Sequence, residues 1–228
     1  ELVDGSRIYG ESAIDIPQKP HREPIKDLFL VPHHKGSISA YPPVIESIKD
    51  SDIILIGPGD LFTSIIASLI VPGIKEAIQS TTARIFYILN IMTKFGETHN
   101  FKRKDFIKKV EIYLGRQVDG IILNNKRPNI RLLKKYFAKK SEFVEIEALE
   151  KQISNRRIYT DDLLDSSDDM VRHNSKKLAS LIQAIISKEY LFERENMTNV
   201  PFLTEFALKD STKKPSMYKS VKALQRIS

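Results

Sequence analysis

Three short, mainly apolar runs constrain the fold of this chain most strongly, because each is followed by a polar loop. They lie at residues 53–56, 84–89 and 118–123. A parallel strand that helices cover on both faces is typically such a run, without the alternation of a half-exposed strand. Amphipathic stretches at 63–70 and 105–114 separate the runs. The order strand, helix, strand, helix, strand predicts βαβ units and a mainly parallel sheet.

We therefore expect an α/β fold, a three-layer sandwich with a Rossmann-like sheet. Residues 1–32 are expected to add a small β-containing segment, with a strand at 25–31. Residues 1–188 would form the α/β domain, and residues 189–228 a flexible C-terminal tail. Shorter patterns predict further helices at 42–48, 74–79, 129–137 and 176–186, and short strands at 143–146 and 157–159.

Composition excludes several classes of protein. The 228 residues contain no Cys, which removes disulfide frameworks and thiolate metal sites. No apolar run approaches the roughly 18 residues that a membrane helix needs, and no secretory signal is visible at the start, so we expect a cytoplasmic protein. The formal net charge is +7, with the basic excess at 102–109, at 126–140 and in the tail from 209, where the first two segments fit solvated helix faces. Without an aromatic and basic platform, this charge favours an anionic small ligand over nucleic acid.

The first run opens into the polar loop 57–64, which reads GPGDLFTS. Gly57 and Gly59 permit positive φ and let backbone amides come close to an anion. Thr63 and Ser64 stand where a helix is expected to begin, and a helix start is itself an anion-binding position. Two interpretations stay open: a phosphate or sugar site, or a tight strand-to-helix turn in which Thr63 is an ordinary cap.

The second run opens into the loop 90–98, which reads NIMTKFGET. Asn90 and Thr93 offer neutral hydrogen-bond donors and acceptors. Two interpretations of the Glu97 carboxylate stay open: it binds a sugar hydroxyl or a metal ion, or it only caps the next helix. Because ligand crevices lie outside the carboxyl ends of parallel strands, both loops should line one crevice. Asn124, at the end of the third run, is expected to reach the same crevice unless it only forms a turn.

Both loops resemble stretches of the YvcK proteins, the gluconeogenesis factors, which form a superfamily with CofD, the 2-phospho-L-lactate transferase of coenzyme F420 synthesis. Residues 57–65 resemble that family's G-P-G-S-L-Y-T-S-I, and residues 90–98 resemble its N-I-M-T-Q-P-G-E-T. Gly10-Glu11-Ser12 is similar to a G-E-S near the middle of the family's sequences, and residues 169–178 are similar to a late V-R-H-D…K-L. Order and spacing agree over residues 1–187.

The chain departs from the family pattern at several positions. Asp60 replaces the usual Ser, Lys94 and Phe95 replace Gln and Pro, and Ala67-Ser68 stand where Pro-Asn is common. Asp60 adds negative charge to a proposed phosphate loop, so the ligand there is expected to be held by hydroxyls or through a cation. The family's opening G-G-G-T-G turn for the nucleotide has no counterpart, so we expect the chain to begin partway through the family's length.

The resemblance implies a UDP-sugar-binding regulatory protein that acts in carbon metabolism and in cell-wall and cell-shape homeostasis, rather than a proven catalyst. The competing hypothesis is a CofD-type 2-phospho-L-lactate transferase with a nucleotide diphosphate-activated donor, which would need Mg²⁺. Asp60 and Glu97 would then be the candidate metal ligands. A third hypothesis is a non-catalytic, partner-binding remnant.

No catalytic residue and no firm cofactor follow from the resemblance. A homodimer is expected to cover the sheet edge that a partial domain would expose. The ligand-binding residues that the resemblance carries over are Gly57, Pro58, Gly59, Asp60, Thr63, Ser64, Asn90, Thr93, Gly96, Glu97, Thr98 and Asn124.

Overall fold

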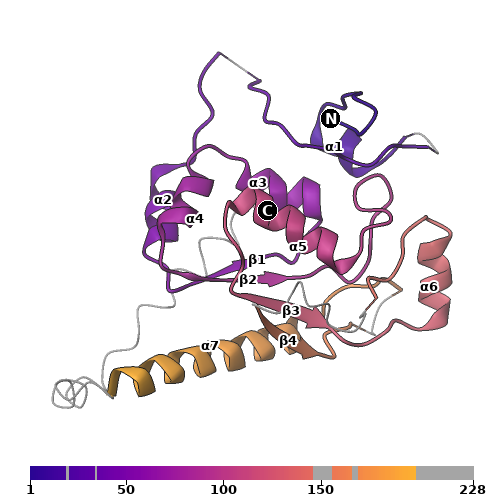
Figure 1. Ribbon diagram of the computed structural model, residues 1–228. Helices are drawn as coiled ribbons and strands as arrows, with labels where there is room; N and C mark the ends of the chain where they lie inside the picture. Colours follow the sequence, from indigo (N-terminus) through magenta and orange to yellow (C-terminus); the bar gives the residue numbers. More distant parts are fainter. Residues whose placement is uncertain (19–20, 34, 146–155, 166–168, 199–228) are drawn as a thin grey trace. The chain divides into compact units, whose positions relative to one another are not determined.

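The structure, a computed structural model, describes residues 1–18, 21–33, 35–145, 156–165 and 169–198. The chain divides into two compact units, Glu1–Lys177 and Leu178–Ser228. The first unit holds the sheet and the helices that pack on it (Figure 1). Helix α7 (Ser175–Thr198) begins in the first unit and continues into the second.

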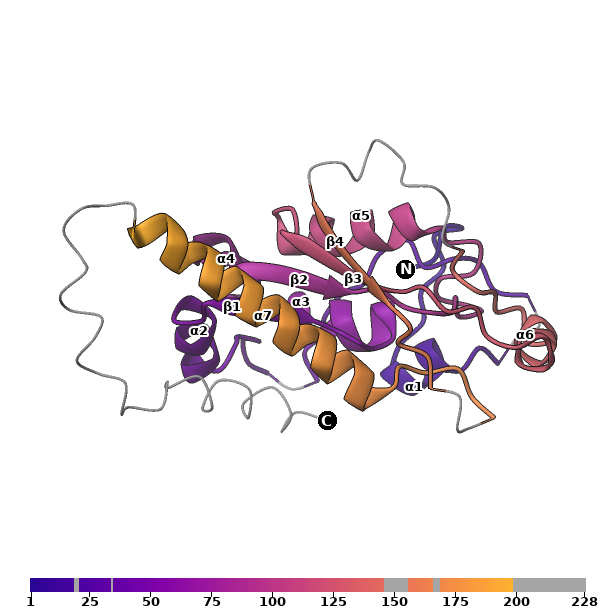
Figure 2. The ribbon, with the colours of Figure 1, turned by 90° about the horizontal axis from the view of Figure 1, so that it is seen from below.

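Within the described ranges the sheet has four parallel strands, which lie side by side in the order of the chain (Figure 2). They are β1 (Ile53–Ile56), β2 (Arg84–Ile88), β3 (Gly120–Asn124) and β4 (Arg157–Asp161). All five residues of β3 are buried, as are the last four of β2. The three apolar runs thus form β1, β2 and β3, and the predicted parallel α/β fold is confirmed.

The helices between β1 and β2 and between β2 and β3 lie on one face of the sheet (Figure 1). Because each strand lies beside the one before it and parallel crossovers are right-handed, successive connections return on the same side. In Figure 1 the labelled helices α2 to α5 lie on one side of β1 and β2. Among the described residues before β4, the helical elements are α1 (Glu11–Asp15), α2 (Pro42–Lys49), η1 (Leu61–Ile66), α3 (Ala67–Leu69), α4 (Ile74–Ser80), α5 (Arg103–Leu114) and α6 (Ile130–Phe137).

The helix after β1 begins earlier and is wider than the sequence predicts. It starts at Leu61 rather than Thr63, and its first six residues form the π-helix η1. The Asp60 carbonyl accepts from both Ser64 N (3.1 Å) and Ile65 N (3.0 Å), so a wider turn is closed at this point. The large apolar side chains of Leu61 and Phe62 are buried in the core, and this packing sets the helix start two residues ahead of the hydroxyl residues.

The predicted strand at 25–31 is not formed. The described residues of this segment make one β contact, an isolated bridge between Leu2 and Ile25. Phe29 and Val31 are exposed, and Leu28 N donates to the Tyr113 hydroxyl (3.3 Å) instead of to a neighbouring strand. The apolar residues of this segment therefore belong to a chain that contacts α5 through Tyr113, rather than to a strand of a sheet.

The remaining predicted elements hold in part. Phe143 forms only an isolated bridge with Met92, whereas the predicted strand at 157–159 extends to Asp161 as β4. The helix predicted at 176–186 runs from Ser175 to Thr198, so the first ten residues of the predicted tail are helical. Residues 199–228 of that tail lie outside the described residues.

Within the part of the chain that the structure describes, no single helix is long and apolar enough to cross a membrane. Two short helical segments, Leu61–Leu69 and Ile74–Ser80, together have the length and composition of a membrane span, but they are bent by 72° relative to each other.

Candidate functional site

The loops that follow β1 and β2 meet at the carboxyl edge of the sheet. Asn90 Nδ2 donates to the Gly59 carbonyl at 2.8 Å, and the buried Tyr87 hydroxyl donates to Asn90 Oδ1 at 3.1 Å. Gly57 has φ of 85°, and a Cβ there would lie 3.1 Å from the Ile88 carbonyl. The crevice that the sequence predicts from the strand ends therefore brings together the first loop and Asn90.

Glu97 is the buried centre of the second loop. Its side chain is 1% exposed, and its carboxylate accepts from Phe62 N (3.3 Å) and from Thr63 Oγ1 (3.3 Å). The amide end of η1, which we expected to receive a ligand anion, is thus already capped by a carboxylate of the chain itself. Burial raises the pKa of Glu97 above its ordinary value, and the nearby Lys94 ammonium opposes that shift.

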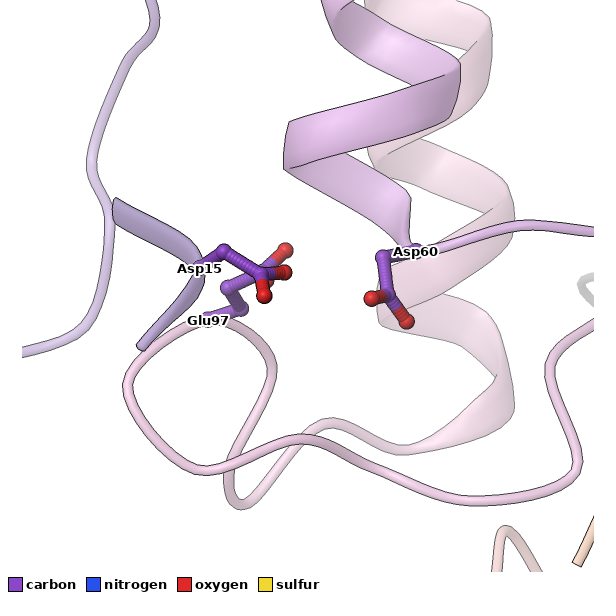
Figure 3. Close-up of side chains that lie close together, drawn as sticks. All are labelled: Asp15, Asp60 and Glu97. Carbon is purple, nitrogen blue, oxygen red and sulfur yellow. The ribbon is translucent and has the colours of Figure 1, made fainter. Parts of the chain in front are cut away.

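Lys94 joins three carboxylates from three segments. Its Nζ pairs with Asp15 of α1, with Asp60 Oδ2 at 2.7 Å and with Glu97 Oε1 at 3.1 Å. Figure 3 shows Asp15 and Glu97 close together, with Asp60 facing them from the start of the helix. Burial alone would lower the pKa of Lys94, but the three carboxylates outweigh it and raise that pKa above its ordinary value.

Several residues expected to bind ligand instead hydrogen-bond to the protein. Thr93 Oγ1 accepts from Glu142 N (2.8 Å), and Thr98 Oγ1 accepts from Lys94 N (2.9 Å). Asn124 Oδ1 accepts from Leu163 N (3.0 Å), while its Nδ2 donates to the Lys126 carbonyl (2.7 Å). Thr93, Thr98 and Asn124 are all buried. Their hydrogen-bonding groups hold the loops in place.

Gly96 is required by its surroundings. It has φ of 83°, a conformation that side chains rarely adopt, and a Cβ there would lie 2.4 Å from Pro17 Cγ and 3.2 Å from Arg22 Cδ. Its N–H donates to His99 Nδ1 at 3.2 Å. The glycine therefore lets the proline-containing segment after α1 lie directly on the second loop, which carries Asp15 toward Lys94.

The accessible part of the site lies on the first loop. Pro58 and Ser64 are exposed, and Gly57, Gly59 and Asp60 are partly exposed. Gly59 lies close to Ser64, because a Cβ at Gly59 would stand 3.2 Å from Ser64 Cβ. The main-chain groups of Gly57–Gly59 and the Ser64 hydroxyl thus form one polar surface beside the η1 start.

A small pocket lies between the end of the second strand and the end of the third. It lies at the carboxyl ends of β2 and β3, so Asn90 and Asn124 reach one crevice although Asn124 is held within the protein. Its lining residues are Leu89, Asn90, Ile91, Arg103, Leu123, Asn124, Phe143 and Val144.

Sequence reasoning missed two members of the site, Asp15 and Lys94. Nothing in the local sequence of α1 marks Asp15, which is brought in by the fold over 79 positions of the chain. The sequence did offer a sign of Lys94, because Lys94 and Asp60 are both departures from the motifs that the two loops resemble, and their charges are opposite. In the structure these two side chains form an ion pair with each other, so the two departures are explained by a single interaction.

A parallel sheet with a polar site formed by its first strand-to-helix loops defines an α/β protein of Rossmann-like architecture. Residues 1–164 match the family described as 2-phospho-L-lactate transferase CofD. The chain therefore belongs to the CofD family.

Similar proteins carry the name gluconeogenesis factor. A putative gluconeogenesis factor of Thermotoga maritima is 39% identical over 153 residues, which cover 65% of this chain and 48% of that protein. The gluconeogenesis factor of Bacillus subtilis is 32% identical over 189 residues, or 82% of this chain and 57% of that protein. The chain spans about half the length of the relatives it matches.

A solved structure has the same fold. The crystal structure of protein BH3568 from Bacillus halodurans superposes with a TM-score of 0.70 at 32% identity, and it covers 80% of this chain and 57% of that one. A second crystal structure of that protein describes it as a member of the UPF0052 family.

Proposed function

We propose that this chain binds a nucleotide sugar of the UDP class and acts through that binding as a regulatory protein of carbon metabolism and of cell-wall and cell-shape homeostasis. The observation that carries the proposal is the meeting of the loops after β1 and β2, through the bond from Asn90 Nδ2 to the Gly59 carbonyl. Beside this contact Pro58 and Ser64 are exposed, and Gly57 and Gly59 are partly exposed. Hydroxyl and main-chain groups at the carboxyl edge of the sheet suit the phosphate and sugar of a nucleotide sugar.

The state of the polar side chains favours binding over catalysis. A general acid or base must exchange protons with a reacting group within hydrogen-bond reach. Glu97 is buried and holds Phe62 N, Thr63 and Lys94, and Asp60 pairs with the same ammonium. These groups already have partners in the protein. The name gluconeogenesis factor of the relatives supports the part of the proposal that concerns carbon metabolism.

A transferase is the second candidate, because the matched family is described as 2-phospho-L-lactate transferase and three carboxylates converge here. That chemistry would need Mg²⁺, which prefers carboxylate oxygens in an octahedral arrangement. The donor set does not fit the ion as it stands, since the Lys94 ammonium already lies 2.7 Å from Asp60 Oδ2 and 3.1 Å from Glu97 Oε1. We derive no reaction step through a metal ion.

The proposal is tested by thermal-shift titration of the full chain with UDP-N-acetylglucosamine and, separately, with GDP and Mg²⁺. A ligand that binds only the folded state stabilises it by about 2.7 kcal/mol at 100 times its Kd. We expect the melting temperature to rise with the UDP-sugar in the absence of Mg²⁺. A rise only with GDP and Mg²⁺ would support the transferase, and no rise with either would contradict nucleotide binding by this chain.

Two serines one helical turn apart provide a matched control. Ser64 and Ser68 are both exposed, but only Ser64 lies beside Gly59. Ser64→Ala should weaken UDP-sugar binding by about 2- to 10-fold, the value of one neutral hydrogen bond, whereas Ser68→Ala should leave it unchanged. Equal affinities of the two variants would remove Ser64 from the site.

A further inference from the structure

The carboxylates of Asp15, Asp60 and Glu97 form a cluster that resembles a cation site in its ligand atoms. One oxygen from each lies within 4.8 Å of the others (Figure 3). The three residues come from α1, from the turn before η1 and from the loop after β2. Like charges held this closely repel one another, so all three carboxylates are ionised together only when a cation lies among them.

In this chain the cation is a side chain. The Lys94 ammonium has three N–H donors and pairs with all three carboxylates, and it is only 30% exposed. A divalent ion bound to the same oxygens would have to displace the ammonium or lie beside a second positive charge. Both alternatives are unfavourable at a partly buried position.

The charge of Lys94 is what the cluster depends on. Lys94 Nζ lies 2.7 Å from Asp60 Oδ2 and 3.1 Å from Glu97 Oε1. A glutamine in place of the lysine supplies no charge, so the carboxylate cluster would then lack an internal cation.

We propose that Lys94 is the permanent cation of this site, occupying the place of a divalent metal ion and cross-linking α1 to both loops. The site then works without a divalent ion, and removal of the ammonium converts the carboxylate cluster into a metal-binding site. This inference does not depend on the proposed binding of a nucleotide sugar, because metal binding is measured without any nucleotide.

The test is a titration of the full chain with Mn²⁺, followed by the EPR signal of the free ion. We expect Lys94→Gln to bind one Mn²⁺ at least 10-fold more tightly than the unmodified chain. Lys94→Arg is the matched control: it keeps a positive charge among the carboxylates and should bind Mn²⁺ no better than the unmodified chain. Adding Glu97→Gln to Lys94→Gln should remove the new site.

Folding of each variant is followed by thermal melting. If Lys94→Gln does not fold in metal-free buffer, Mn²⁺ should restore its cooperative transition, because the ion would supply the missing cross-link. The proposal is overturned if the unmodified chain binds Mn²⁺ at this cluster as tightly as Lys94→Gln. It is equally overturned if Lys94→Gln neither binds Mn²⁺ nor regains its transition with the ion.

Discussion

The buried carboxylate of Glu97 should contribute more to stability than the exposed carboxylate that shares its ammonium partner. Glu97 is 1% exposed and serves three groups, whereas the Asp60 side chain is 45% exposed and contacts Lys94. Glu97→Ala leaves the buried Phe62 amide unpaired, while Lys94 keeps Asp15 and Asp60 as partners, for an expected loss of about 1–3 kcal/mol in the free energy of unfolding. Asp60→Ala removes a largely solvated pair, which is worth about 0–1 kcal/mol.

The measurement is urea unfolding of the full chain and the two variants, followed by far-UV circular dichroism. Glu97→Gln provides a further comparison, because it keeps an acceptor for Phe62 N while removing the charge whose burial raises the Glu97 pKa. Its loss should fall between those of the two alanine variants. Losses for Glu97→Ala and Asp60→Ala that agree within about 0.5 kcal/mol, with unchanged m-values, would refute this reasoning.

Three further predictions concern backbone, packing and pH. Gly96→Ala should lower the melting temperature more than Gly5→Ala. Both glycines have positive φ (83° and 82°), but a Cβ at Gly96 would lie 2.4 Å from Pro17 Cγ, whereas a Cβ at Gly5 would meet nothing within 4 Å; equal shifts would contradict this clash. Gly120→Ala should lower the free energy of unfolding by about 1–3 kcal/mol through overpacking, because its Cβ would lie 2.5 Å from the ring of the buried Phe86. Adding Phe86→Leu should recover part of that loss, and no recovery would show that the clash is not the cause. Burial lowers the pKa of His173 from 6.5 to about 4, so the stability it contributes is present above pH 6.5 and lost as the pH falls toward 4. The free energy of unfolding should therefore fall by about 3 kcal/mol between pH 6.5 and pH 4. His173→Phe should reduce the slope of the unfolding free energy against pH over this range, and an unchanged slope would exclude His173 as its source.

The central strands were predictable because their environment leaves a simple trace in the sequence. Strands β2 and β3 lie between other strands and are buried along almost their whole length, so they appear as mainly apolar runs. The loops that follow them were predictable for the same reason, since parallel strands end at one edge. The segment 25–31 misled because it contains several exposed apolar residues but no pairing strand, and an apolar segment alone does not indicate a partner.

The roles of the individual site residues were less predictable. The sequence marks Glu97, Thr93 and Thr98 as polar residues at a strand end, but a polar side chain can face a ligand or the protein, and only the packing decides which. Thr93 and Thr98 hydrogen-bond to main-chain amides, and Glu97 caps η1. Asp15 forms an ion pair with Lys94 although the two residues are far apart in the sequence, and no periodic pattern predicts a contact between such distant charges.

The order of the strands also bears on how the chain reaches its native state. Each of β2, β3 and β4 pairs with the strand that precedes it in the chain, and among the described strands none is inserted between two earlier ones. During synthesis, β2 can therefore pair with β1 as soon as residues 84–88 leave the ribosome, and each later strand adds to the edge left open by the one before it. The sheet grows in the same direction as the polypeptide, so no completed pairing has to reopen to admit a later strand.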